Sequence, residues 1–106
     1  MNRWNIPDDL ERRVLKRDTH CVYCGNELKQ PPHPRGACGS WEHIDNDDWD
    51  PPTPGNIARC CGTCNTSKGT KALVQWFRSD YCIRRKINEK TVAPIVRDWL
   101  KARRLL

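Results

Sequence analysis

Two cysteine pairs with the same spacing constrain this chain more than any other feature: Cys21-Val22-Tyr23-Cys24 and Cys61-Gly62-Thr63-Cys64. Paired C-x-x-C motifs are typical of zinc ribbons and knuckles, in which four thiolates hold one tetrahedral ion and close its coordination. The residues between the pairs must then form a sizeable excursion from the metal. The sequence therefore predicts a structural Zn²⁺ bound by Cys21, Cys24, Cys61 and Cys64.

A chain of this size benefits from such a cross-link. Its 106 residues are 37% hydrophobic and 30% charged, which fits one domain with a small core. A structural zinc site supplies on the order of 10–16 kcal/mol of apparent binding free energy, most of which appears as folding free energy. We therefore expect the metal to be needed for folding.

Seven cysteines could instead form the disulfide framework of a secreted protein. The number is odd, however, and residues 1–4 do not begin an apolar signal peptide. No apolar run approaches the length of a membrane span. The sequence therefore predicts an intracellular, cytoplasmic protein with reduced thiols and no membrane partner.

Short elements are expected around the cysteine pairs. A helix is predicted over residues 6–17, since Pro7 and acidic residues suit its first turn and Leu10 and Val14, with Leu15 beside them, form an apolar stripe. Alternating residues at 40–44 and 56–60 predict two strands that pair as a hairpin. A further helix is predicted after residues 68–70, with Thr70 as its N-cap.

The last helix has the clearest periodicity. Pro94 is acceptable there because it falls in the first turn. The apolar stripe packs either on the domain's own core or against a second copy of the chain, and the sequence leaves both open. The stripe follows helical spacing at Val92, Ile95, Val96, Trp99 and Leu100.

Charge is distributed unevenly along the chain. The net charge is +6, yet residues 65–106 alone carry eleven basic and three acidic side chains, a net of +8. Residues 21–64 carry three basic and six acidic side chains. A basic third beside an acidic middle indicates contact with a polyanion such as DNA, or else a solubilising surface.

Between and just after the cysteine pairs lie residues that the metal does not need. In order, the chain reads C-V-Y-C, W-E-H-I, N-I-A-R-C and C-G-T-C-N-T-S-K-G. This order and spacing resembles the HNH endonuclease family over residues 6–79. The resemblance implies an α+β fold with a small ββα-metal (His-Me finger) core, two zinc knuckles and flanking helices. The domain would span residues 1–106, with its core at about 6–79 and a basic helical extension over 80–106.

The resemblance also implies a function, metal-dependent hydrolysis of DNA phosphodiester bonds. His43 would be the general base, Glu42 and Asn65 would bind one catalytic Mg²⁺ or Mn²⁺, and Asn56 would hold the His-bearing segment in register. The family more often has Asp before the His, and neighbouring strand residues point to opposite faces. The ion must therefore sit at a strand end, or the strand must bend. The expected DNA contacts are Lys68, Lys71 and Arg59.

Several alternatives stay open. A zinc-stabilised nucleic-acid-binding module without catalysis would keep the cysteines and make no use of Glu42 or His43. A C-x-x-C redox protein would need one exposed pair near a βαβ unit. One such site cuts one strand, so a homodimer or a larger phage or defence complex is an expected assembly. Cys61 is preferred over Cys60 as a ligand because only Cys61 forms C-x-x-C with Cys64, and the roles of Cys38 and Cys82 are open.

Overall fold

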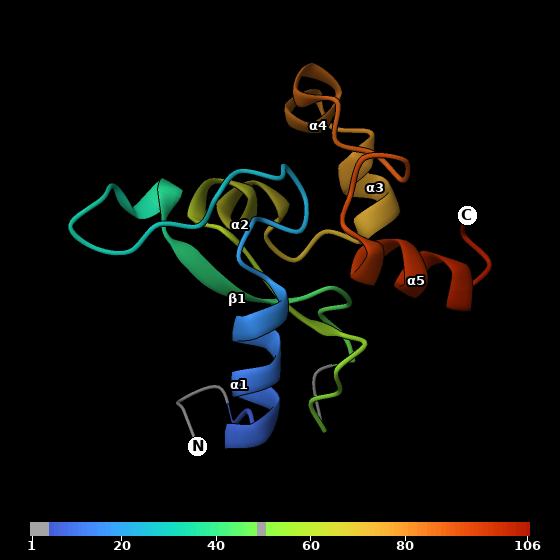
Figure 1. Ribbon diagram of the computed structural model, residues 1–106. Helices are drawn as coiled ribbons and strands as arrows, with labels where there is room; N and C mark the ends of the chain where they lie inside the picture. The colour runs from blue at the N-terminus through green and yellow to red at the C-terminus, as the bar shows by residue number, and fades with distance from the viewer. Residues whose placement is uncertain (1–4, 49–50) are drawn as a thin grey trace.

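A two-stranded antiparallel sheet lies at the centre of an α+β fold (Figure 1). The computed structural model describes residues 5–48 and 51–106, so the expectation for residues 1–4 lies outside it. Strand β1, Gly39–His43, pairs with β2, Ile57–Cys61, and places Trp41 opposite Arg59. The hairpin is confirmed, with each strand displaced by one residue from its expected bounds.

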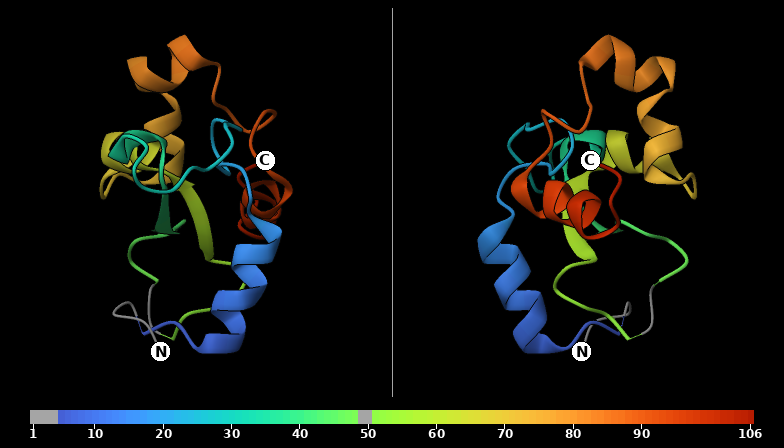
Figure 2. Two further views of the ribbon diagram at one scale, coloured as in Figure 1. Left: turned by 60° about the vertical axis from the view of Figure 1, so that its left-hand side comes forward. Right: turned by 90° about the vertical axis from the view of Figure 1, so that its right-hand side faces the viewer.

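Helix α1, Asp8–Arg17, covers one face of this sheet. It starts directly after Pro7, and its buried residues Leu10 and Val14 pack with Ile6, Ile57 and the edge of Trp41. The expected end of the helix is confirmed, and so are Leu10 and Val14 of the expected stripe, whereas Leu15 is exposed. Helix α1 lies at one end of the molecule and α4 at the other, in every view (Figures 1 and 2).

The main core lies on the opposite face of the sheet. At its centre Trp76 is fully buried, with its ring centroid 4.9 Å from that of Tyr23. Helix α5, Pro94–Ala102, begins with proline at its first position, as expected. Its residues Val96, Trp99 and Leu100 are buried in this same core. The C-terminal stripe therefore packs on the chain's own core.

Three short helices connect the hairpin to α5: α2, Gly62–Lys68; α3, Leu73–Phe77; and α4, Asp80–Arg85. The expectation that Thr70 caps α3 is wrong, because the N-cap is Ala72. At Thr70 the chain is still leaving α2 through Gly69, whose φ of 55° is in the left-handed region. A 3₁₀ turn, η1, at Arg35–Ala37 precedes β1 and packs beside α2.

Candidate functional site

The four predicted cysteines come together where the turn at residues 21–24, which we call the first knuckle, meets the end of β2 and the start of α2. The Sγ atoms of Cys21, Cys24, Cys61 and Cys64 all lie within 4.8 Å of one another, and those of Cys24 and Cys61 are 3.8 Å apart. A tetrahedral ion with Zn–S bonds of about 2.3 Å requires sulfurs separated by about 3.8 Å. The cluster can therefore hold a structural metal such as zinc.

Hydrogen bonds orient the sulfurs of this cluster. The backbone N–H groups of Cys24 and Cys64 approach the Sγ atoms of Cys21 and Cys61, each at 3.4 Å. From α4, the hydroxyl of Tyr81 lies 3.2 Å from Cys64 Sγ. Such outer contacts fix the geometry and charge of metal ligands. No sequence motif indicates this role for Tyr81, because it lies outside both C-x-x-C pairs, on a helix that the pattern does not predict.

The structure also shows which of the adjacent residues Cys60 and Cys61 belongs to the sulfur cluster: Cys61 does and Cys60 does not. Cys60 is fully buried and belongs to the core, outside the sulfur cluster. Burial raises the pKa of the Cys60 thiol. All seven cysteines lie in the described part of the chain, and all are free of disulfides. Cys38 is half-buried and Cys82 is buried, both away from the cluster.

Glu42 lies on the core face of β1 and is only 3% exposed. Its Oε2 accepts a hydrogen bond of 2.8 Å from the Tyr23 hydroxyl and lies 3.2 Å from Lys68 Nζ. Burial raises the pKa of Glu42, while Lys68 and Tyr23 oppose that rise. Lys68 is itself fully buried. Its expected contact with a DNA phosphate is therefore corrected: its ammonium faces Glu42 inside the protein.

His43 is the last residue of β1 and points to the face opposite Glu42, the face that carries Trp41. Its side chain is half-buried. Lys68 Nζ also donates to the backbone oxygen of His43, at 3.3 Å. Burial and the nearby charge of Lys68 lower the pKa of His43. The imidazole therefore favours its neutral form, the form that can accept a proton.

Asn56 ties the segment after His43 to the start of β2. It is 2% exposed, and its Oδ1 accepts a hydrogen bond of 2.8 Å from Asp45 N–H. Its Nδ2 donates to the backbone oxygens of Asp45 and Asp48. The backbone oxygen of Asn56 accepts from Ile44 N–H, at 2.9 Å. One buried amide thus fixes the path of the chain on leaving the strand that carries His43.

Asn65 lies on α2, half-buried, three residues before Lys68 and therefore on a similar side of the helix. It lines a hollow of about 990 Å³ together with Ser40, which shares a strand face with Glu42. Gly39, on the alternate face of β1, lines the same hollow, and Glu42 and His43, as neighbours on this strand, point to opposite faces. The expected metal ligands and the expected base are not gathered on one face.

The two other expected DNA contacts differ in exposure. Lys71 is exposed, and its Nζ donates to the backbone oxygen of Ser67 at 3.1 Å. Arg59 is half-buried, with its guanidinium carbon 4.8 Å from the ring centroid of Trp41. Lys71 is the better placed of the two to meet a polyanion.

Comparisons with known proteins yield no match: no family model, no curated protein and no solved structure aligns with this chain. Within residues 5–48 and 51–106, no helix has the length and apolar character to cross a membrane.

The buried pair of Lys68 and Glu42 gives a first prediction, on stability. Replacing Lys68 with methionine removes the cation and leaves a buried carboxylate without its ionic partner. We expect Lys68→Met to lower the free energy of unfolding by about 3–5 kcal/mol, the usual effect of breaking a buried ion pair. Urea unfolding of the zinc-loaded protein measures this change.

The matched control removes both charges. Glu42→Gln combined with Lys68→Met keeps an amide acceptor for Tyr23, so most of the lost stability should return. A loss below about 1 kcal/mol in Lys68→Met alone, within the range of exposed ion pairs, would contradict the importance assigned to the pair.

Proposed function

We propose that the chain is a metal-dependent DNA endonuclease of the HNH type, stabilised by a structural zinc. The observation that carries the proposal is the Asn56 clamp. A buried asparagine directly before β2 holds the segment that follows His43, through three hydrogen bonds from its side-chain amide. The conformation of the chain after the candidate base is thereby fixed. A general base needs such a fixed backbone, because its side chain must be oriented toward the proton that it accepts.

The order of the elements gives further support. The chain runs from β1, which ends at His43, through β2 to α2, which carries Asn65 and follows β2 without a break. Because His43 is the last residue of its strand, a divalent ion at this strand end would be accessible to both sheet faces. Glu42 and Asn65 have the oxygen donors that Mg²⁺ or Mn²⁺ prefers. Such an ion would stabilise charge on the scissile phosphate, and His43 would activate the attacking water.

Incubation of the protein with supercoiled plasmid tests this proposal. With Mg²⁺ or Mn²⁺ added, we expect conversion to nicked and then linear DNA. Without an added divalent ion, the zinc-loaded protein should leave the plasmid intact. Omitting the ion is a better control than a strong chelator, which would also remove the structural zinc. A preparation of His43→Ala, purified in parallel, controls for contaminating nucleases.

One observation favours a second candidate function. Oε2 of Glu42 already has the Tyr23 hydroxyl at 2.8 Å and the Lys68 ammonium at 3.2 Å. A divalent cation would have to share this carboxylate with a buried positive charge. In a zinc-stabilised nucleic-acid-binding module, the same pair is a stabilising contact only. Salt-dependent DNA binding without cleavage by the wild-type protein would favour this module.

A further inference from the structure

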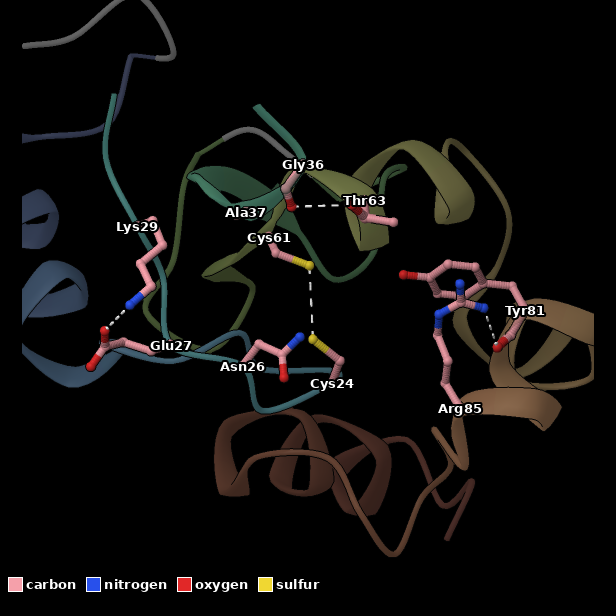
Figure 3. Close-up of a pocket in the computed structure, with 10 residues that line it drawn as sticks. All are labelled: Cys24, Asn26, Glu27, Lys29, Gly36, Ala37, Cys61, Thr63, Tyr81 and Arg85. Atoms are coloured by element: carbon pink, nitrogen blue, oxygen red, sulfur yellow. Dashed lines mark hydrogen bonds and ion pairs between the residues drawn. The ribbon is translucent and has the colours of Figure 1, made fainter. Parts of the chain in front are cut away.

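Two hollows meet at Gly36, Thr63 and Tyr81, on the side of the molecule where η1, α2 and α4 come together. The first, of about 670 Å³, extends from this junction toward Lys29 and Arg85 (Figure 3). The second, of about 990 Å³, runs along α2. We name the two together the double hollow. Its second half contains Asn65, the residue assigned to the catalytic ion.

Exposed cations line the double hollow beside the metal centre. Cys24 and Cys61, two of the four predicted zinc ligands, also line its first half, and four thiolates with one Zn²⁺ carry a net charge of −2. Among the described residues that line it, Lys29, Arg35 and Arg85 are basic and Glu27 alone is acidic. Glu27 lies 2.5 Å from Lys29 Nζ, so these two charges offset each other. Arg35 and Arg85 are both exposed. Two cations thus remain for a ligand, one in each half.

Arg85 is held in place before any ligand binds. Its guanidinium carbon lies 3.8 Å from the centroid of the Tyr81 ring, and its Nη1 donates to the Tyr81 backbone oxygen at 3.3 Å. Figure 3 shows both side chains beside the first hollow. Ordering a free arginine on binding costs side-chain entropy, and this stacking removes part of that cost.

Hydroxyl-bearing side chains also line the double hollow. A hydroxyl can donate a hydrogen bond to a phosphate oxygen without adding negative charge, although that of Thr63 already donates to the Gly36 backbone oxygen at 3.1 Å. The hydroxyl-bearing residues there are Ser40, Thr63, Thr66, Ser67 and Tyr81.

We propose that the double hollow is the DNA-binding surface of this chain, with Arg35 and Arg85 each holding a backbone phosphate. The inference rests on the proposed function, since a DNA strand bound in the double hollow would reach Asn65, the proposed ligand of the catalytic ion. It replaces the buried Lys68 as the expected phosphate contact. The basic residues of α1 are less suited, because Asp8, Asp9 and Glu11 stand in the first turn of that helix.

Fluorescence anisotropy with a labelled DNA duplex tests the inference, in the His43→Ala protein so that the duplex stays intact. We expect Arg35→Glu combined with Arg85→Glu to weaken binding at least tenfold. The slope of log Kd against log salt should fall by about two, one for each lost phosphate contact. The neutral pair Arg35→Gln and Arg85→Gln should show a smaller loss in the same direction.

The matched control makes the same charge change elsewhere. Arg12 and Arg13 are exposed on α1, at the end of the molecule opposite α4 (Figure 2). Replacing both with glutamate should weaken binding less than threefold. Equal losses in the two double variants would overturn the inference, because the DNA would then respond to net charge alone. Absence of DNA binding by the parent protein would overturn it as well.

The outcome is separable from that of the proposed function. If wild-type protein binds DNA through Arg35 and Arg85 but never cleaves it, the double hollow stands and the nuclease proposal fails. If wild-type protein cleaves DNA and the two arginines do not affect binding, the nuclease proposal stands and the double hollow fails. Zinc content and circular dichroism of each variant confirm that it is folded.

Discussion

Replacing either Cys21 or Cys61 with serine is expected to unfold most of this protein at room temperature. A structural zinc site contributes on the order of 10–16 kcal/mol of apparent binding free energy to folding. The net stability of a small domain is only about 5–15 kcal/mol, so loss of the metal exceeds or equals the whole margin. Zinc content and far-UV circular dichroism measure the result.

The position of the cluster explains why the effect is global. The N–H of Val22 donates to the Arg59 oxygen, and the N–H of Ala93 donates to the Val22 oxygen. The first knuckle thus joins β2 to the start of α5. Without the metal, the knuckle loses the restraint that holds these two contacts together. Chelation of zinc from the wild-type protein should therefore unfold it, and added zinc should restore it.

Cys38→Ser is the matched control for these variants. Cys38 is half-buried and lies outside the sulfur cluster, so the same exchange of sulfur for oxygen should cost under about 1 kcal/mol there. Full zinc retention in both Cys21→Ser and Cys61→Ser would refute the metal centre. A wild-type protein that stays folded without metal would refute its role in folding.

The sequence predicted the helices whose apolar residues recur at helical spacing and the metal site whose cysteines have a characteristic spacing. The C-x-x-C pairs predicted which four sulfurs meet, and the stripes predicted α1 and α5. The resemblance to a ββα-metal core implies a helix after the two strands, but no periodicity predicts α2, because Gly62, Thr63, Asn65, Thr66 and Ser67 are weak helix formers. Tertiary contacts stabilise it instead. The Cys61 sulfur accepts from Cys64 N–H at its start, and a Cβ on Gly62 would lie 2.4 Å from the Arg35 oxygen.

Lys68 illustrates what a sequence does not reveal about a charged residue. A lysine beside Gly69 in a basic segment predicts an exposed cation, because lysine is rarely buried without a partner. Its partner, Glu42, is 26 positions earlier, and the hydrogen bond from Tyr23 comes from a third segment. Burial and pairing here depend on the packing of α2 against β1. The local sequence contains no trace of that packing.

The second large effect concerns catalysis: His43→Ala should reduce plasmid cleavage by about 10²–10⁴-fold, the usual contribution of a positioned general base. Burial and the charge of Lys68 hold the pKa of His43 below its ordinary value of 6.5. The neutral form that accepts a proton from water therefore predominates at pH 7. Cleavage rates at saturating Mg²⁺ or Mn²⁺ measure the loss.

His43→Ala should lower the rate of the cleavage step without changing folding or DNA binding. His43 is half-buried at the end of its strand, and its contact with Lys68 uses the backbone oxygen, which alanine retains. Zinc content and DNA affinity should therefore match the wild type. The variant His20→Ala, which changes an exposed histidine, should cleave at the wild-type rate. Undiminished cleavage by His43→Ala would remove the general base from the mechanism, whereas equal losses in both variants would point to damage that is not specific to the base.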